Sequence, residues 1–219
     1  MNNMEKQIVK IKSSITDGHY AFKNINSKSA FTNKMTEAMA VKLKPNDIVA
    51  DIGGYVGEYS LYAHKQGVKK IYTYEPTPST FELLKKNKKP NMEIFQKAVT
   101  GVDIDNVNLY TSNGIGVTNS IAKKTRKKGL ITVPAIKYEE ALKDANIVKI
   151  DVEGAEYSYN IIQPQLRAII IEFHPIEKQD WVSQAFKIMN EIKNKGFKPL
   201  HEPKFSNGWD CHASYVRYE

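Results

Sequence analysis

The residues with the clearest chemical potential are two acids and two glycines in the first half of the chain. Asp51 precedes the turn Ile-Gly53-Gly-Tyr-Val-Gly57, and Glu75 follows 18 residues after Gly57. Glycine is needed where the backbone takes a positive φ or passes close to a ligand. An acid at the end of the next strand is placed to accept hydrogen bonds from ribose hydroxyls. This combination predicts a site for the adenosine part of a cofactor.

The spacing of this motif distinguishes between two classes of nucleotide cofactor. A dinucleotide fingerprint reads G-x-G-x-x-G, and aligning Gly53 with its second glycine places Asp51 at the first and Val56 at the third. The chain instead reads D-x-G-x-x-x-G, the pattern of class I methyltransferases that use S-adenosylmethionine. That cofactor has no pyrophosphate, so an acid is free to face its methionine amino group. We expect Glu75 to bind the ribose and the methionine part to lie against Asp51, Gly53, Gly54, Tyr55 and Gly57.

A second group of polar residues follows two later strands of the predicted sheet. Asp151-Val-Glu153 comes after the fourth strand, and Glu172-Phe-His174 closes the fifth. Residues at i and i+2 share a face of a strand, so the members of each pair are expected to point together. At the carboxyl ends of parallel strands they would border the transferred methyl group. The pattern predicts His174, Asp151 and Glu153 as catalytic residues, with Asp151 also next to the cofactor.

This second group suits proton transfer from a hydroxyl acceptor. Methyl transfer requires the acceptor oxygen to be aligned with the methyl carbon and its proton to be removed. A histidine or a carboxylate in this position can act as the general base, and His174 is the first choice. Alternatively, Asp151, Glu153 and Glu172 can hold a divalent cation such as Mg²⁺, which lowers the pKa of the hydroxyl.

The elements that carry these residues alternate between strands and helices. Such alternation predicts an α/β fold with a mostly parallel, seven-stranded sheet and helices on both faces, the class I methyltransferase (Rossmann-like) fold. Asn207-Gly208 indicates a C-terminal antiparallel hairpin. We expect an N-terminal extension and helix over 1–45 and a methyltransferase domain over 46–219. The expected strands are 8–11, 47–52, 70–74, 93–98, 107–110, 130–133, 147–150, 166–173, 197–201 and 212–218, and the expected helices are 32–43, 57–66, 79–87, 138–143, 155–162 and 181–195.

Two further expectations depend on this layout. Ala98 closes the third strand of the series, where its backbone and that of its neighbours would contact the adenine ring. Substrate choice is expected in the segments with the least regular patterns, residues 1–45, 100–136 and 202–212. Asp210 and His212 lie in or beside the last of these, and local pattern assigns them no role.

Composition limits the class of protein. With 219 residues the chain is long enough for one well-buried core. Its apolar runs are too short to span a bilayer, and no basic segment followed by an apolar one opens it, so we expect neither a membrane span nor a signal peptide. The lone cysteine, Cys211, excludes an internal disulfide and a cysteine metal cluster. These features together predict a cytoplasmic protein.

The formal net charge of +8 includes one dense local cluster, Lys123-Lys124-Thr-Arg126-Lys127-Lys128. One interpretation is a solvated loop. The other is a binding surface for an anionic acceptor such as a phosphorylated glycan, a nucleotide sugar or a nucleic acid. Both interpretations stay open.

Several segments resemble the FkbM family of methyltransferases, in order, over about residues 47 to 175. The resemblance implies S-adenosylmethionine-dependent O-methylation of a sugar, a glycan or a related small molecule, including anionic ones. The family usually has Asn at the position of Tyr55, and a bulky ring there would narrow the cofactor pocket. The segments are Asp51-Ile-Gly-Gly-Tyr-Val-Gly-Glu-Tyr-Ser60, Tyr74-Glu-Pro-Thr-Pro78, Val133-Pro-Ala-Ile-Lys-Tyr138, Val148-Lys-Ile-Asp-Val-Glu-Gly-Ala-Glu156 and Ile171-Glu-Phe-His174.

Other functions of the same fold fit less well. Base methylation is not indicated, because Asp151-Val-Glu-Gly154 contains no proline and Cys211 follows Asp210 rather than proline. A ribose 2′-O methyltransferase that uses the 123–128 cluster stays open, since Lys149 and Asp151 match part of a Lys-Asp-Lys-Glu set. A third hypothesis is a binding protein that keeps the fold without the reaction, for which Tyr55 is the only indication.

Overall fold

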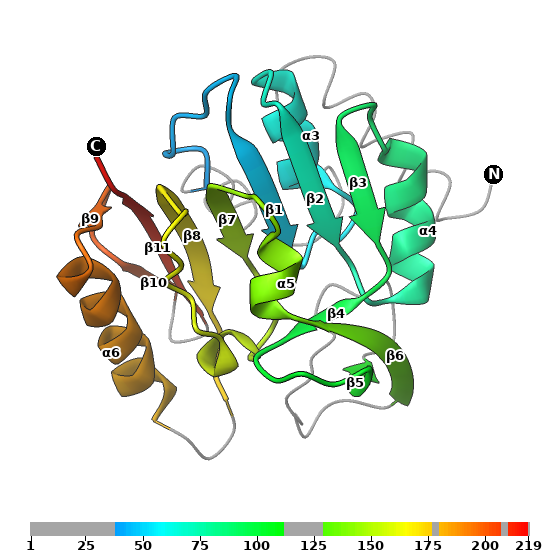
Figure 1. Ribbon diagram of the computed structural model, residues 1–219. Coiled ribbons are helices and arrows are strands. Elements are labelled where there is room, and N and C mark those ends of the chain that lie inside the picture. Colours follow the sequence, from blue (N-terminus) through cyan, green and yellow to red (C-terminus); the bar gives the residue numbers. More distant parts are fainter. Residues whose placement is uncertain (1–37, 112–128, 177–179, 207–209, 219) are drawn as a thin grey trace.

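The computed structural model describes residues 38–111, 129–176, 180–206 and 210–218. Its main sheet has the strand order β10-β11-β8-β7-β1-β2-β3, and β9 also pairs with β11 (Figure 1). The five strands from β8 to β3 in this order run parallel, as expected for alternating strands and helices. They are β1 (Ile48–Ile52), β2 (Lys70–Tyr74), β3 (Met92–Phe95), β7 (Ile147–Ile150) and β8 (Ala168–Phe173).

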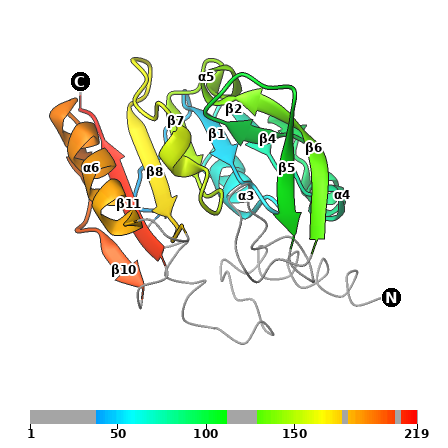
Figure 2. The same ribbon diagram turned by 90° about the horizontal axis from the view of Figure 1, so that it is seen from below.

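Helices cover both faces of this sheet because its strands are apolar on both sides. Ala50 and Ile52 face one hydrophobic cluster with α5 (Tyr138–Leu142) and α6 (Trp181–Asn194). Val49 faces a second cluster with α3 (Glu58–Lys65) and α4 (Pro78–Asn87). In Figure 2, α5 and α3 lie on opposite sides of β1 and β2. The predicted mostly parallel α/β fold is therefore confirmed.

An antiparallel group forms the other edge of the sheet. β11 (Asp210–Val216) pairs with β8 and also with β9 (Lys198–Pro199) and β10 (Lys204–Ser206), all antiparallel. The predicted closing hairpin is present, but β11 begins at Asp210 rather than at His212. The register places His212 opposite Glu172. Both Asp210 and His212 are therefore strand residues beside the end of β8.

A small second sheet differs from the expectation for residues 93–98. The third strand of the main sheet ends at Phe95, and Ala98 instead opens β4 (Ala98–Thr100). β4 pairs with β6 (Gly129–Lys137), which also pairs with β5 (Asn106–Thr111). The polar pair Gln96-Lys97 separates the two strands, and Ala98 packs in a separate apolar cluster of this sheet. Figure 1 shows the small sheet beyond the carboxyl ends of β2 and β3.

Two expected helices are also corrected. Residues 155–162 contain only the short 3₁₀ helix η1 (Glu156–Ser158). Tyr159 leaves the helix because its hydroxyl donates to Val99 O at 2.9 Å and its ring stacks on Tyr138. Of the expected helix over 32–43, Ala38 is helical, whereas residues 39–43 are turn or irregular.

The remaining expectations for the N-terminal part and the loops lie outside the described residues. The first is the segment 1–37, in which a strand was expected at 8–11. The other two are the basic cluster 123–128 and the turn at Asn207-Gly208. Among the described residues, no helix is both long enough and apolar enough to cross a membrane.

Candidate active site

The glycine turn after β1 is shaped by its neighbours in the sheet. Gly53 and Gly54 both donate their N–H groups to Tyr74 O, at 3.0 and 2.9 Å. Gly53 has a φ of +79°, and a Cβ on it would lie 1.8 Å from Asp151 O. Gly57, with a φ of +91°, is the N-cap of α3. The glycines therefore bring the end of β1 into contact with the ends of β2 and β7.

Asp51 is fully buried at the start of this turn. Its Oδ2 accepts hydrogen bonds from Ser60 N at 3.1 Å and Ser60 Oγ at 2.6 Å. Ser60 Oγ also lies 2.7 Å from Thr73 Oγ1. Asp51 Oδ1 makes no hydrogen bond. One carboxylate oxygen thus orients the first turn of α3, while the other remains an acceptor.

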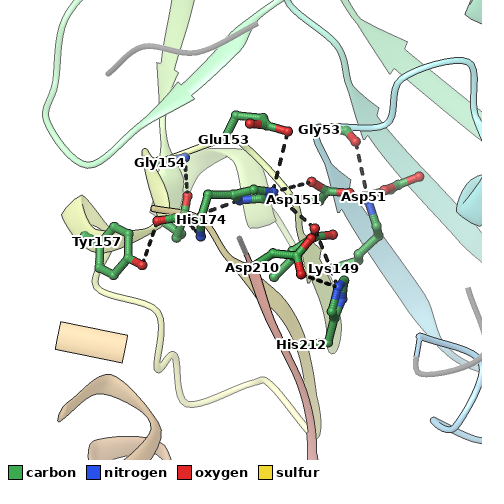
Figure 3. A network of polar contacts seen from close by, with 12 residues as sticks. Asp51, Gly53, Lys149, Asp151, Glu153, Gly154, Tyr157, His174, Asp210 and His212 are labelled. Carbon is green, nitrogen blue, oxygen red and sulfur yellow. Dashed lines mark hydrogen bonds and ion pairs between the residues drawn. The ribbon is translucent and has the colours of Figure 1, made fainter. Parts of the chain in front are cut away.

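Lys149 lies between the ends of β1 and β7, and the sequence did not single it out for the cofactor. Its Nζ is 3.6 Å from Asp51 Oδ1, 3.3 Å from Asp151 Oδ2 and 3.4 Å from Gly53 O (Figure 3). Burial alone would lower the pKa of Lys149, but the Asp151 and Asp51 carboxylates raise it above its usual range. The Lys149 ammonium group therefore lies beside Asp51, the acid that was expected to face the amino group of the cofactor.

Glu58, the first residue of α3, is a further acid that the sequence reasoning missed. Its Oε1 is buried without a hydrogen bond. Burial raises the pKa of Glu58 to about 8, although the charge of Lys149 lowers it. Its position directly after Gly57 was the available signal, since it begins the helix that faces the predicted cofactor.

Glu75 ends β2 as a buried carboxyl group held by backbone donors. Its Oε2 accepts from Tyr55 N at 3.1 Å, and its Oε1 accepts from Thr77 N at 2.8 Å. Burial raises the pKa of Glu75 to about 7, even though these hydrogen bonds lower it. Tyr55 has a φ of +51°, a left-handed conformation in which Asn is more common than Tyr. The Glu75 carboxyl group therefore holds the backbone of the glycine turn at Tyr55.

The second predicted group gathers around the ring of His174, which is 4 % exposed (Figure 3). Its Nε2 lies 3.2 Å from Glu172 Oε1, 3.6 Å from Glu153 Oε1 and 3.7 Å from Asp151 Oδ1. Its Nδ1 lies 3.4 Å from Glu156 Oε1. Burial alone would lower the pKa of His174, but the Glu153 and Glu172 carboxylates raise it well above its usual range. The structure brings together all four residues that the sequence predicted here.

The backbone around His174 is held by η1. The fully buried Glu156 accepts from His174 N at 2.6 Å and from Gly154 N at 2.7 Å. The Tyr157 hydroxyl donates to His174 O at 2.9 Å. Glu153 and Gly154 both have positive φ, which folds the segment after β7 back toward β8. A turn rather than a continuous helix therefore points Glu153 at the histidine.

Asp210 and His212 complete the cluster from β11, and no local pattern predicted this. His212 Nε2 lies 3.6 Å from Glu172 Oε1 and 3.6 Å from Asp210 Oδ1. Glu172 thus stands between two histidines. Ala98, by contrast, is buried in β4 of the small sheet, and its expected contact with adenine stays a prediction.

A parallel sheet of this order, with an acid and a glycine turn after β1, an acid after β2 and polar residues after β7 and β8, defines the class I methyltransferases that use S-adenosylmethionine. Residues 51–199 match the family model described as the methyltransferase FkbM domain. The chain therefore belongs to the FkbM family of methyltransferases, as its motifs indicated.

The chain is also similar to solved methyltransferase structures, and the first of those described below shares its fold. A precorrin-6y C5,15-methyltransferase of Geobacter metallireducens GS-15 is similar with a TM-score of 0.50 and 12% identity, covering 90% of this chain and 92% of that one. A ribosomal protein L11 methylase of Lactobacillus delbrueckii subsp. bulgaricus has a TM-score of 0.48 and 12% identity, covering 90% of both chains. The magnesium protoporphyrin IX methyltransferase of Synechocystis PCC 6803, solved with bound S-adenosylmethionine, has a TM-score of 0.43 and 12% identity. The match covers 100% of this chain and 85% of that one. No curated protein matches the sequence significantly.

Proposed function

We propose that this methyltransferase transfers the methyl group of S-adenosylmethionine to a hydroxyl of a sugar, a glycan or a related small molecule. The position of Asp151 carries the proposal. Its Oδ2 lies 3.3 Å from Lys149, beside the glycine turn, and its Oδ1 lies 3.7 Å from His174. One carboxylate therefore joins the predicted cofactor end to the histidine cluster, as transfer between two neighbouring ligands requires.

The residues at the cofactor end fit S-adenosylmethionine. The buried Asp51 Oδ1 makes no hydrogen bond and lies 3.6 Å from the Lys149 ammonium, so it keeps lone pairs for the amino group of the cofactor. The Glu75 carboxylate has about four acceptor positions and accepts the N–H groups of Tyr55 and Thr77 and a hydrogen bond from the Thr77 side chain, which leaves capacity for a ribose hydroxyl. When bound, the cofactor supplies an electrophilic methyl group on its sulfonium sulfur. Asp51, Glu75 and the turn from Gly53 to Gly57 would hold and orient it.

The residues at the other end suit a hydroxyl acceptor. A hydroxyl must lose its proton as its oxygen attacks, so it needs a proton acceptor within hydrogen-bond reach. Asp151 is the most exposed carboxylate that faces His174, with 31% of its side chain accessible, and Glu153 follows with 17%. In this proposal the two carboxylates orient the hydroxyl, and one of them takes up its proton.

The carbohydrate character of the acceptor is supported by the family to which the chain belongs. Its motifs resemble those of enzymes that methylate sugar or polyketide hydroxyls. The small sheet of β4, β5 and β6 lies beyond the carboxyl ends of β2 and β3, where it would contact such an acceptor (Figure 1).

The first test is calorimetric titration with S-adenosylmethionine. The wild-type chain is expected to bind it with micromolar affinity, and Glu75→Ala is expected to weaken binding at least about tenfold, because the ribose loses a charged acceptor. Glu82→Ala, which removes an exposed acid of α4, is the matched control and should bind as the wild type does. Absence of wild-type binding would overturn the proposal and favour a binding protein without the reaction.

The second test identifies the acceptor. Radiolabelled S-adenosylmethionine is incubated with the protein and panels of sugars, nucleotide sugars, phosphorylated glycans and RNA. Label is expected on a carbohydrate hydroxyl, located by mass spectrometry of the product. Label found only on RNA would overturn the carbohydrate as the acceptor and would favour a ribose 2′-hydroxyl of a nucleic acid instead.

A further inference from the structure

The ring of His174 is unusual among the buried groups of the described chain. Both of its nitrogens are buried and make no hydrogen bond, although carboxylates surround them. A buried polar atom without a hydrogen bond destabilises the folded state. Such an atom in a native structure calls for an explanation, and an ion that belongs among these groups is one.

The distances around His174 Nε2 favour such an ion over direct hydrogen bonds. Nitrogen–oxygen hydrogen bonds span about 2.7–3.2 Å, so Glu172 Oε1, at 3.2 Å, lies at the limit of this range, whereas the oxygens of Glu153 and Asp151 lie beyond it, at 3.6 and 3.7 Å. Ligands that bind one cation at about 2.1 Å lie about 3.0 Å apart in octahedral and about 3.4 Å apart in tetrahedral geometry. The distances of 3.2 to 3.7 Å between His174 Nε2 and the carboxylate oxygens are close to these spacings between ligands of one cation.

The ligand set comes from strand ends that the fold holds in place. Ligand atoms of Asp151, Glu172 and His174 all lie within 4.8 Å of one another, and so do those of Glu172, Asp210 and His212. Glu172 belongs to both groups and is contacted by His212 Nε2 from β11. The backbone of His174 is fixed by Glu156. The donors therefore converge without any large movement of the chain.

We propose that Asp151, Glu172 and His174 bind one divalent transition-metal ion, with Glu153 as a further ligand. Asp210 and His212 position Glu172 from the side of β11. Imidazole nitrogen favours ions such as Mn²⁺, Fe²⁺ or Zn²⁺ over Mg²⁺, which prefers oxygen ligands alone. The ion site itself depends only on geometry, whereas its role rests on the proposed function: beside the acceptor hydroxyl, the ion lowers the pKa of that hydroxyl.

The test is titration of the purified chain with MnCl₂ in the absence of S-adenosylmethionine and of any acceptor, followed by electron paramagnetic resonance of free Mn²⁺. The wild type is expected to bind one Mn²⁺, and His174→Ala is expected to weaken binding at least about 100-fold through loss of a ligand. Asp151→Asn is a second variant, at a partly exposed residue of nearly the same shape. His201→Ala is the matched control, because His201 lies on another segment and its ring contacts the backbone of Glu202.

The proposal is overturned if the wild type binds neither Mn²⁺ nor Zn²⁺ at millimolar concentration, or if His174→Ala and Asp151→Asn bind as tightly as His201→Ala. Circular dichroism of each variant shows that it is folded, and Asp151→Asn decides the question if His174→Ala does not fold. The proposed function fails on a different result, which is the absence of S-adenosylmethionine binding or of methyl transfer. Those two quantities are measured in separate experiments from the Mn²⁺ titration.

Discussion

The two ends of the candidate site are built differently. At the ends of β1 and β2, Glu75 accepts two backbone N–H groups, and Asp51 Oδ2 accepts two donors from Ser60. At the ends of β7 and β8, the backbone of His174 is equally well held by Glu156, yet its ring nitrogens make no hydrogen bond. In the first region Glu75 and Asp51 Oδ2 are satisfied by their own chain and Asp51 Oδ1 remains, whereas in the second region neither nitrogen of the His174 ring makes a hydrogen bond.

This difference separates affinity from rate. A region that is already hydrogen-bonded offers a rigid surface to a ligand that is the same in every turnover. A region of converging charges acts on the group whose charge changes during the reaction. Substitutions at the first region should therefore change cofactor binding and folding, whereas substitutions at the second should change turnover.

The largest expected effect comes from the second region. His174→Ala should lower kcat at least about 1000-fold, because it removes the ring around which the proton-accepting carboxylates converge, while the affinity for S-adenosylmethionine stays within about twofold. Single-turnover methyl transfer and calorimetry measure the two quantities on the same preparation. Turnover that persists in this variant would break the comparison, and so would a loss of cofactor affinity as large as that of Glu75→Ala.

The next effect tests whether the first region is shaped by the chain itself. Gly53→Ala should destabilise the fold by about 3 kcal/mol or more, because its Cβ would lie 1.8 Å from a backbone oxygen at a φ of +79°. Gly67→Ala is the matched control, since Gly67 has a φ of +77° with no atom within 4 Å of the added Cβ. It should cost only about 1 kcal/mol. Urea unfolding without ligand measures both, and equal losses would show that only backbone conformation matters.

A third effect sharpens the role of Glu75. Burial raises the pKa of this carboxyl to about 7, so it holds its proton below that pH and loses it above. The charged form is the better acceptor for ribose hydroxyls, so affinity for S-adenosylmethionine should rise about tenfold from pH 6 to pH 8. Calorimetry at a series of pH values measures this, and the rise should be absent in Glu75→Gln. Glu58→Gln separates the contribution of Glu58, whose pKa is about 8.

The smallest expected effect concerns Tyr55. Tyr55→Asn should stabilise the fold by about 1 kcal/mol, because Asn adopts the left-handed conformation at a φ of +51° more readily than Tyr does. Thermal unfolding without and with S-adenosylmethionine measures the change and any altered cofactor binding. An unchanged or lower melting temperature without ligand would indicate that the tyrosine ring contributes packing that exceeds this cost.

Local patterns predicted the parts of the fold that local sequence determines. The apolar runs of β1, β2 and β7 each end at an acid or at a residue next to one, so their limits and their polar ends were predicted nearly to the residue. Residues 155–162 were expected to be helical, but the distant contact of Tyr159 with Val99 limits the helix to Glu156–Ser158. Likewise, Ala98 was assigned to the main sheet, since its partner strand β6 is far away in the sequence.

The candidate site shows the same limit. His174 and Glu172 were predicted to point together because they are two residues apart on one strand, and their contact at 3.2 Å confirms it. Lys149 was seen only as part of another enzyme motif, because its contacts with Gly53 and Asp51 come from a neighbouring strand. Asp210 and His212 depend on the pairing of β11 with β8, which no short segment encodes.

The pairing of His212 with Glu172 has a consequence for assembly of the edge of the sheet. Because side chains alternate along a strand, a slip of one residue between β8 and β11 would turn His212 and Asp210 to the opposite face. A chain misaligned in this way would lose the contact between His212 and Glu172 and would present a polar pair to the apolar layer beneath α6. His212 and Asp210 therefore favour the correct register of β11 against β8, because the misaligned form is less stable.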